Sequence, residues 1–385
     1  MNDYAQRALL PAGMRDILPP EAAHEAAVVA RLMAACAAQG YERVKPPLVE
    51  FEDSLLAGSG TAMGPHTFRL MDPVSQRMMG LRADMTLQVA RIATTRLAKA
   101  PRPLRLSYAG QVLRVKGDDM RAERQFGQVG AELIGSDAAS ADAEVVLLSA
   151  AALEAVGIAD LTIDLSSPKL VPALLAPLGL SAAQARRLRS ALDHKDSAGV
   201  AGIAGAAAAP LRALLSAAGP AETALAAIKR IRLPPDAAGE SARLDEVTAL
   251  IRAAAPKLRL TIDPVENRGF EYHRGLCFTL FADRVRGELG RGGRYLSGES
   301  IGADVAEPAT GVTLYMDSIL RAVPPPVPVR RLFVPHGTPP SEAARWRAEG
   351  WVTVAGLASG VDTRAEAHRL DCSHVLADGA PKAIG

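Results

Sequence analysis

The residues best suited to bind a small polar ligand stand in one short segment, Arg268-Gly-Phe-Glu-Tyr-His-Arg-Gly275. Arg268, Tyr272 and His273 all carry hydrogen-bonding groups, which are costly to bury without a partner. The glycines in the segment allow a positive φ or a close backbone approach, which suits a loop wrapped round a ligand. The competing interpretation is a charged surface turn between two strands, and the loop alone favours that interpretation.

A second set of polar residues lies on the segment Arg124 to Ile134, which reads as a strand. Side chains alternate between the faces of a strand, so Gln128 and Glu132 project the same way, roughly 13 Å apart along it. Gly130 between them leaves a gap where a side chain would otherwise stand. A polar floor with a gap suits a small polar ligand, but antiparallel sheets often have a solvated polar face as well. This strand alone leaves the two interpretations equally open.

The elements that must position these residues follow from hydrophobic periodicity and from turn signals. We expect helices at about Glu21–Gln39, Thr86–Lys99 and Ala138–Val156, a hairpin formed by Phe68–Met71 and Met78–Arg82, and strands at Tyr41–Val49 (interrupted by Pro46-Pro47), Leu104–Val112, Arg124–Ile134, Leu161–Leu165, Leu258–Ile262 and Leu276–Phe281. Gly311 to Arg321 is either a helix or a strand that runs into one.

The composition and the hydrophobic periodicity of the chain change twice after about residue 168. From Pro168 to Ala255 alanine and leucine dominate at helical spacing, which predicts a helical insertion. After the stiff linker Pro324-Pro-Pro-Val-Pro328, short strands alternate with helices as in a small α/β unit. The predicted organisation is an α+β core over residues 1–323, with a helical insertion at about 168–256, and a small C-terminal α/β domain at 329–385.

Composition excludes several function classes. The chain has 385 residues and a formal net charge of only +2, from 44 basic and 42 acidic residues. This balance does not predict a nucleic-acid or membrane partner, and no apolar stretch approaches the roughly 20 residues that span a bilayer. Without a secretion signal, we expect a cytoplasmic protein with three reduced, mostly buried cysteines: Cys36, Cys277 and Cys372. The sequence has no metal-ligand pattern, phosphate loop or serine-nucleophile elbow, so we expect no metal and no cofactor.

Four motifs, in order and correctly spaced, resemble the catalytic core of histidyl-tRNA synthetase, a class II synthetase. They are Leu81-Arg-Ala-Asp-Met-Thr86, Gln125-Phe-Gly-Gln-Val-Gly-Ala-Glu132, Arg268-Gly-Phe-Glu-Tyr-His273 and Gly292-Gly-Arg-Tyr295. The likeness covers nearly the whole chain and is closer to a non-catalytic paralogue, the regulatory subunit family of ATP phosphoribosyltransferase. It implies a class II synthetase-like fold, in which an antiparallel sheet is flanked by helices.

The resemblance also implies a site for free histidine. Asp84 and Thr86 match the positions that hold the amino group, and Arg268 matches the arginine near the carboxylate. The remaining implied ligand-binding positions are Arg114, Gln128, Glu132, Tyr272 and His273. An acid, an arginine and a group that reads the imidazole are the residue types that histidine needs, and charge-assisted hydrogen bonds contribute about 1.5–3 kcal/mol each. Two departures are Glu271, where the family usually has Asp, and His273, which replaces a second tyrosine.

The nucleotide half of the cleft departs further from a synthetase. Arg114 matches one ATP-binding arginine, but Lys116 stands where an acid that reads adenine is expected. In the third motif, Tyr315 replaces a glycine, Asp317 a glutamate and Ser318 an arginine. Losing one preorganised charge partner typically costs a few kcal/mol at a transition state, and serine does not replace a delocalised cation. We therefore expect no synthetase activity and no enzyme activity of the chain's own.

The resemblance implies a regulatory subunit in the first step of histidine biosynthesis. Its expected partners are a short-form ATP phosphoribosyltransferase catalytic subunit and histidine as a feedback effector, and the chain would be a homodimer, joined through about Glu21 to Leu56, inside a hetero-oligomer. Three alternatives stay open: a divergent but active histidyl-tRNA synthetase, a stand-alone histidine sensor, and a scaffold whose pocket is dead.

Overall fold

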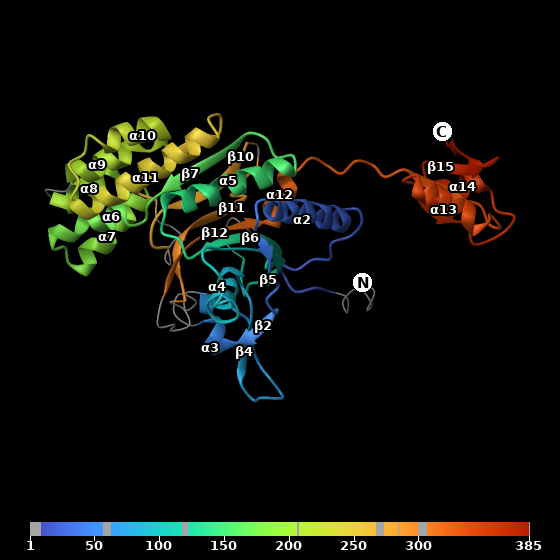
Figure 1. The fold of residues 1–385 in the computed structure, drawn as a ribbon, viewed down its shortest axis with the longest axis horizontal. Helices are drawn as coiled ribbons and strands as arrows, with labels where there is room; N and C mark the ends of the chain where they lie inside the picture. The colour runs from blue at the N-terminus through green and yellow to red at the C-terminus, as the bar shows by residue number, and fades with distance from the viewer. Residues whose placement is uncertain are drawn as a thin grey trace. The chain divides into compact units, whose positions relative to one another are not determined.

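A computed structural model of the protein describes residues 9–56, 63–117, 122–205, 208–266, 273–283, 285–298 and 306–384. The chain divides into two units, Met1–Pro324 and Pro325–Gly385, each built on its own sheet or sheets. The colour bar of Figure 1 locates both units along the chain.

A nine-stranded sheet forms the centre of the larger unit in the described part of the chain. Its strands in spatial order are β1 (Glu42–Arg43), β5 (Leu104–Leu113), β6 (Gln125–Ile134), β12 (Glu307–Tyr315), β11 (Gly290–Ser297), β10 (Cys277–Ala282), β7 (Leu161–Ser166), β9 (Arg259–Ile262) and β8 (Gly219–Pro220). The pairings from β5 to β7 are all antiparallel, whereas β1 pairs with β5, and β7 with β9, in parallel. The predicted antiparallel sheet is therefore present, with parallel pairings toward both ends.

Helices cover both faces of this sheet, as Figure 1 shows. On one face, α2 (Glu21–Ala38) and α5 (Ala139–Ala155) pack on the odd-numbered apolar residues of β6, such as Val129, and α11 (Pro235–Ala254) packs against α5. On the other face, α4 (Thr86–Thr95) packs on the even-numbered residues, such as Phe126. Both faces of β6 are thus buried, and the solvated-face interpretation of this strand is wrong.

Two proline and glycine signals shape the first part of the chain. Gly40 ends α2 with φ 82°, a conformation that favours glycine. The Pro46-Pro47 pair, which cannot donate ladder hydrogen bonds, splits the expected strand into β1 and β2 (Val49–Phe51). The short helix α3 (Glu52–Leu55) follows, and β2 joins a separate sheet in the order β2-β4-β3. The other two strands of that sheet are β3 (Arg69–Met71) and β4 (Met78–Leu81), the predicted hairpin.

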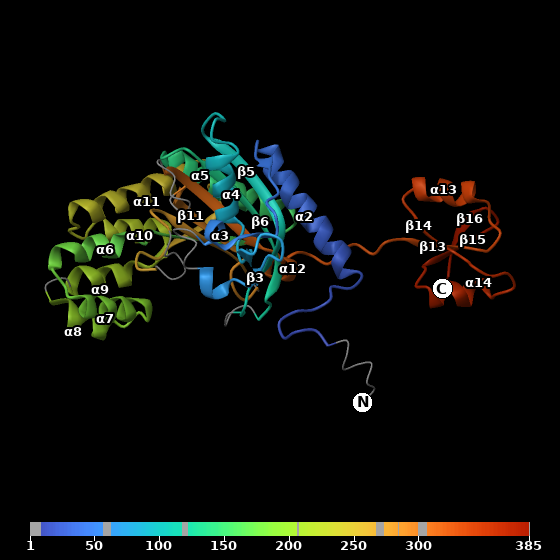
Figure 2. The ribbon, with the colours of Figure 1, turned by 90° about the horizontal axis from the view of Figure 1, so that it is seen from below.

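The predicted insertion is helical and lies at one end of the sheet (Figure 2). Its helices before α11 are α6 (Leu170–Leu175), the 3-10 helix η2 (Ala176–Leu178), α7 (Ala182–Asp193), α8 (Ser197–Ala204), α9 (Ala208–Ala217) and α10 (Ala221–Ile228). Ser181 and Gln184 form a capping box at the start of α7, and Asp196 caps α8. Strand β8 adds the insertion to the sheet by pairing with β9.

The smaller unit has a four-stranded sheet in the order β14-β13-β15-β16. Its elements are β13 (Arg331–Val334), α13 (Pro340–Ala348), β14 (Val352–Ala355), α14 (Thr363–Arg369), β15 (His374–Ala377) and β16 (Ala380–Ala383). The alternation of strands and helices agrees with the sequence pattern. The last strand, β16, was not predicted, because its residues lack an apolar alternation.

The structure decides three further expectations from the sequence, which concern the segment from Gly311 to Arg321, the end of α4 and the cysteines. Gly311 to Arg321 is a strand, β12, that runs directly into helix α12 (Met316–Ala322). Helix α4 ends at Thr95, four residues before the expected end. All three cysteines are free and buried, as predicted, and burial raises the pKa of the Cys36 thiol to about 11. Among the described residues, no helix has the combination of length and apolar character that crossing a bilayer requires.

Candidate functional site

Three of the predicted site residues meet where α4 begins beside strand β6. Gln128 donates a hydrogen bond from Nε2 to Asp84 Oδ2 at 2.9 Å, and its Oε1 accepts one from the Met85 backbone N–H at 3.2 Å. The other oxygen of Asp84, Oδ1, accepts from the Thr86 backbone N–H at 2.9 Å. Asp84 therefore sits at the positive end of α4, where a helix favours a negative charge. Unlike Gln128, which is buried, Asp84 is only half-buried and can reach a ligand.

Glu132, further along β6, is 0% exposed. Tyr108 donates a hydrogen bond to its Oε1 at 3.1 Å, and Tyr295 donates one to its Oε2 at 2.9 Å. The carboxyl group lies directly over Gly311 of β12, where a Cβ atom would stand 1.7 Å from Oε2. Only glycine at this position leaves room for the Glu132 side chain.

Tyr108 lies between Glu132 and the start of α4, where Asp84 stands. Its hydroxyl lies 3.1 Å from the Thr86 hydroxyl and 3.1 Å from the Thr313 hydroxyl. Its ring occupies the gap predicted at Gly130, its cross-strand neighbour, where a Cβ atom would come within 2.2 Å of the ring. The prediction of an open hole in the floor is therefore wrong, because an aromatic ring from β5 fills it.

The electrostatics of the site follow from this enclosure. Burial raises the pKa of Glu132 to about 8, against the lowering effect of the hydrogen bonds from Tyr295 and Tyr108. The negative charge of Asp84 raises the pKa of Glu132 further. The site thus holds one carboxyl group that is largely neutral at pH 7, beside a second, half-buried one at the start of a helix.

The other predicted site residues lie in different parts of the chain, and two of them are outside the described residues. Arg268 and Tyr272 lie outside the described residues. His273 is buried and lies over Gly293, the cross-strand neighbour of Gly311, so it belongs to the same face of the sheet. Arg114, just after β5, donates from Nε to the backbone oxygen of Ala83 at 3.4 Å, which places it beside the start of α4.

The substituted residues of the third motif are packed inside the protein. Tyr315 is buried, and its ring meets that of Phe126 edge-on, with centroids 6.2 Å apart. The Arg114 guanidinium lies 5.2 Å from the centre of the same Phe126 ring. Ser318 is buried and accepts a hydrogen bond from Arg321 at 3.0 Å. These contacts are within the chain, so the space beside Phe126 is lined by its own aromatic and cationic groups.

Sequence reasoning missed Tyr108, Thr313 and the role of Tyr295. Tyr295 stands in the quoted Gly292-Gly-Arg-Tyr295 motif, so its position was visible although its contact was not. Tyr108 and Thr313 have no motif of their own. Their only signal is register, because both face Gly130 across neighbouring strands.

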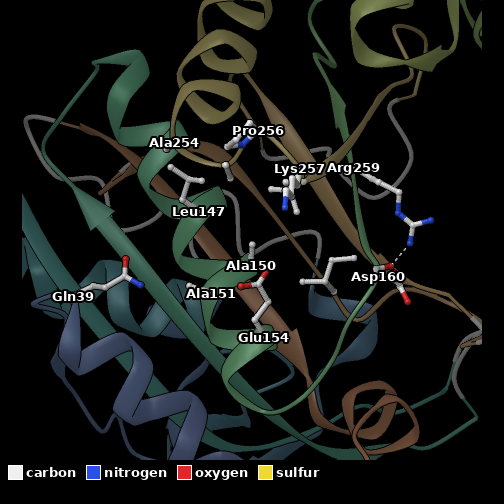
Figure 3. Close-up of a pocket in the computed structure, with 13 residues that line it drawn as sticks. Gln39, Leu147, Ala150, Ala151, Glu154, Asp160, Ala254, Pro256, Lys257 and Arg259 are labelled. Carbon is white, nitrogen blue, oxygen red and sulfur yellow. Dashed lines mark hydrogen bonds between the residues drawn. The ribbon is translucent and has the colours of Figure 1, made fainter.

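A surface cavity of about 720 Å³ lies elsewhere, on the side of the sheet that α5 covers. Figure 3 shows its wall of small residues from α5, including Ala150 and Ala151, opposite the segment from Ala254 to Arg259. Its charged side chains, such as Glu154, are exposed. None of the predicted site residues that the structure describes lines this cavity, so the site beside α4 remains the candidate.

Comparison with known proteins finds close relatives over the whole chain. The family model described as histidyl-tRNA synthetase matches residues 13–319. An ATP phosphoribosyltransferase regulatory subunit from Rhodospirillum centenum is 60% identical over 372 residues, which cover 97% of this chain and 95% of that protein. One of the same name from Paramagnetospirillum magneticum is 60% identical over 376 residues, covering 98% of each.

Solved structures show the same fold. An ATP phosphoribosyltransferase regulatory subunit/histidyl-tRNA synthetase from Bacillus halodurans superposes with a TM-score of 0.83 at 24% identity, covering 94% of this chain and 96% of that one. A histidyl-tRNA synthetase from Nostoc sp. superposes with a TM-score of 0.78 at 17% identity, covering 96% and 91%. The predicted class II synthetase-like fold is confirmed.

Proposed function

The chain belongs to the family of ATP phosphoribosyltransferase regulatory subunits, and from this premise we propose that it binds free histidine at the site beside α4 and passes feedback inhibition to a short-form catalytic subunit. The family inferred from the sequence motifs is confirmed, and its role is regulatory, in histidine biosynthesis. The ligand, the catalytic partner and the feedback are the proposal.

The observation that carries the histidine proposal is the pair of carboxyl groups on one buried face. Asp84 is half-buried at the end of α4 and suits an ammonium group. Glu132 lies deeper, between two tyrosine hydroxyls, and suits the N–H of an imidazole ring. Arg268, whose position lies outside the described residues, is the proposed partner of the ligand's carboxylate.

We further propose that the chain does not activate an amino acid with ATP. The burial of Tyr315 against Phe126 supports this, because a nucleotide base needs an open aromatic face. So does the burial of Ser318, which carries no charge for a phosphate. An ATP–pyrophosphate exchange assay with histidine should show no exchange. Measurable exchange would show that the chain activates histidine as a synthetase does.

The proposed assembly is a homodimer of this chain within a hetero-oligomer. The segment from Glu21 to Leu56 includes α2 and the edge strand β1, whose outer edge has no neighbouring strand in the described sheet. Feedback is then a coupling between two sites: histidine must lower substrate affinity by the factor by which substrate lowers histidine affinity. Co-purification with the catalytic subunit separates this assembly from a stand-alone sensor.

Calorimetric titration with histidine, together with inhibition of the reconstituted complex, tests the proposal. Glu132→Ala should weaken histidine binding at least tenfold and relieve inhibition to a similar extent. The matched control is Glu144→Ala, which removes a carboxylate that pairs with Arg105 at 2.7 Å and does not contact the site. Equal inhibition of the parent and Glu132→Ala complexes would exclude Glu132 as the site of feedback.

A further inference from the structure

A buried ion cluster lies on the sheet face opposite the proposed histidine site, centred on Asp142. Asp142 stands in the first turn of α5 and is 0% exposed. Its Oδ1 accepts hydrogen bonds from Arg294 Nε at 3.0 Å and from the Thr310 hydroxyl. Its Oδ2 accepts from Arg243 Nη2 at 2.8 Å. One carboxylate therefore joins β11, β12 and helix α11 of the insertion.

The residues that Asp142 holds are direct neighbours of the site. Arg294 on β11 and Thr310 on β12 are cross-strand partners, so both side chains project to the α5 side. The next residues along these strands project the other way. They are Tyr295, which donates to Glu132, and Gly311, on which Glu132 rests.

Arg294 also binds the segment that follows β6, the third strand of the site. Its Nη1 donates to the Ser136 backbone oxygen and to Asp137 Oδ1, both at 3.0 Å, and its Nη2 donates to the Ala138 backbone oxygen at 3.1 Å. These residues form the connection that follows β6, the strand that carries Glu132. One buried Asp142–Arg294 pair thus braces β11, β12 and the connection after β6 on the α5 side of the sheet, in addition to the backbone ladders that set the register of these strands.

We propose that Asp142 is a positioning residue of the histidine site, which sets the geometry of Tyr295, Gly311 and Glu132 without touching the ligand. This rests on the proposed binding of histidine. The effect falls on the imidazole end of the site, since Asp84, at the ammonium end, is held by α4 and Gln128 instead. Arg243 makes the same geometry sensitive to the position of the helical insertion.

The mildest test removes one hydroxyl. Thr310→Val preserves volume in a fully buried position but removes the hydrogen bond to Asp142. We expect its dissociation constant for histidine to rise about tenfold, and its preference for histidine over β-(2-thienyl)alanine, which lacks a ring N–H, to fall by a similar factor. Thr310→Ser restores the hydroxyl and should restore both. Arg243→Leu, at a partly exposed position, should give a smaller loss of about threefold.

The control is Thr248→Val, the same change at another buried threonine, whose hydroxyl donates to the Leu244 backbone oxygen within α11. It should lower the melting temperature without changing either histidine measurement. A Thr310→Val protein that is less stable but binds histidine with parental affinity and preference would overturn the inference alone. A parent protein that binds no histidine would instead overturn the proposed function on which the inference rests.

Discussion

Replacing Glu132 with glutamine should remove a pH dependence of stability that the parent protein has between pH 6 and pH 8. Burial raises the pKa of this carboxyl group from 4.5 to about 8 in the folded chain. Between these values the folded protein keeps a proton that the unfolded chain has released. Stability therefore falls as the pH rises through the interval, because the unfolded state then binds fewer protons than the folded state.

The magnitude follows from the same shift. Each pH unit well inside the interval costs about 1.4 kcal/mol, and this slope falls to about half at pH 8, where the folded group is half-protonated. The group should therefore lower the parent's free energy of unfolding by about 2 kcal/mol from pH 6 to pH 8. Glutamine keeps the shape of the neutral carboxyl group and can still accept from the Tyr108 hydroxyl. The Glu132→Gln protein should therefore be more stable than the parent at pH 8, with a difference that shrinks toward pH 5.

Urea denaturation at 25 °C, at pH 5, 6, 7 and 8, measures this difference. Asp164 provides a matched control, since burial raises the pKa of its carboxyl group to about 6. Asp164→Asn should change the pH dependence mainly below pH 6 and leave the interval from pH 7 to pH 8 as in the parent. Parallel stability curves for the parent and Glu132→Gln proteins from pH 6 to pH 8 would show that the Glu132 carboxyl group does not hold its proton in the folded state.

Further predictions concern packing and reactivity. Gly130→Ala places a Cβ atom 2.2 Å from the ring of Tyr108 and should destabilise the protein by about 1–3 kcal/mol, whereas Gly239→Ala, in a helix with nothing within 4 Å, should stabilise it by about 0.5–1 kcal/mol; urea titration measures both. Gly311→Ala should displace Glu132 and weaken histidine binding at least tenfold by calorimetry. Cys36 should resist alkylation by iodoacetamide at pH 8 until the chain is unfolded, because burial raises its thiol pKa to about 11; rapid labelling under native conditions would contradict this.

The sequence predicted most of the strands and helices around the site, since these have local signatures. It did not predict β11, which carries Tyr295, because the segment opens with Gly-Arg-Gly-Gly and lacks an apolar alternation there. Helix α5 is one residue shorter than expected at each end, and strand β6 begins one residue later than expected and ends at the expected residue. The side chains of Gln128 and Glu132 share one face, as alternation requires. What alternation could not decide is whether that face is wet or covered, because α4, which covers it, is placed by tertiary packing.

The partners of Glu132 were not predictable for the same reason. Tyr108 and Tyr295 lie 24 and 163 residues away in the chain. Only strand order and register bring them to one carboxyl group. The glycine at position 130 is compatible with a gap for a ligand, yet a glycine opposite an aromatic residue serves equally to admit a neighbouring ring. Sequence alone does not distinguish a space left for a ligand from a space left for the protein itself.

The contacts at Asp84 and Glu132 bear on how such a site could signal. Both oxygens of each carboxyl group already accept hydrogen bonds from this chain. A carboxyl group has more than two acceptor sites, and its carbonyl oxygen keeps two lone pairs when the group is protonated. A ligand can therefore add a hydrogen bond to these contacts, but neither acid lacks a partner before the ligand binds. Glu132 is also fully enclosed, so an imidazole can reach it only if groups that cover it move, and the side chains of Tyr108 and Tyr295 are among these groups. Histidine binding at Glu132 would therefore require a displacement of protein groups. A ligand that binds the displaced arrangement better than the closed one shifts the equilibrium between these two states, whereas simple filling of an open pocket does not.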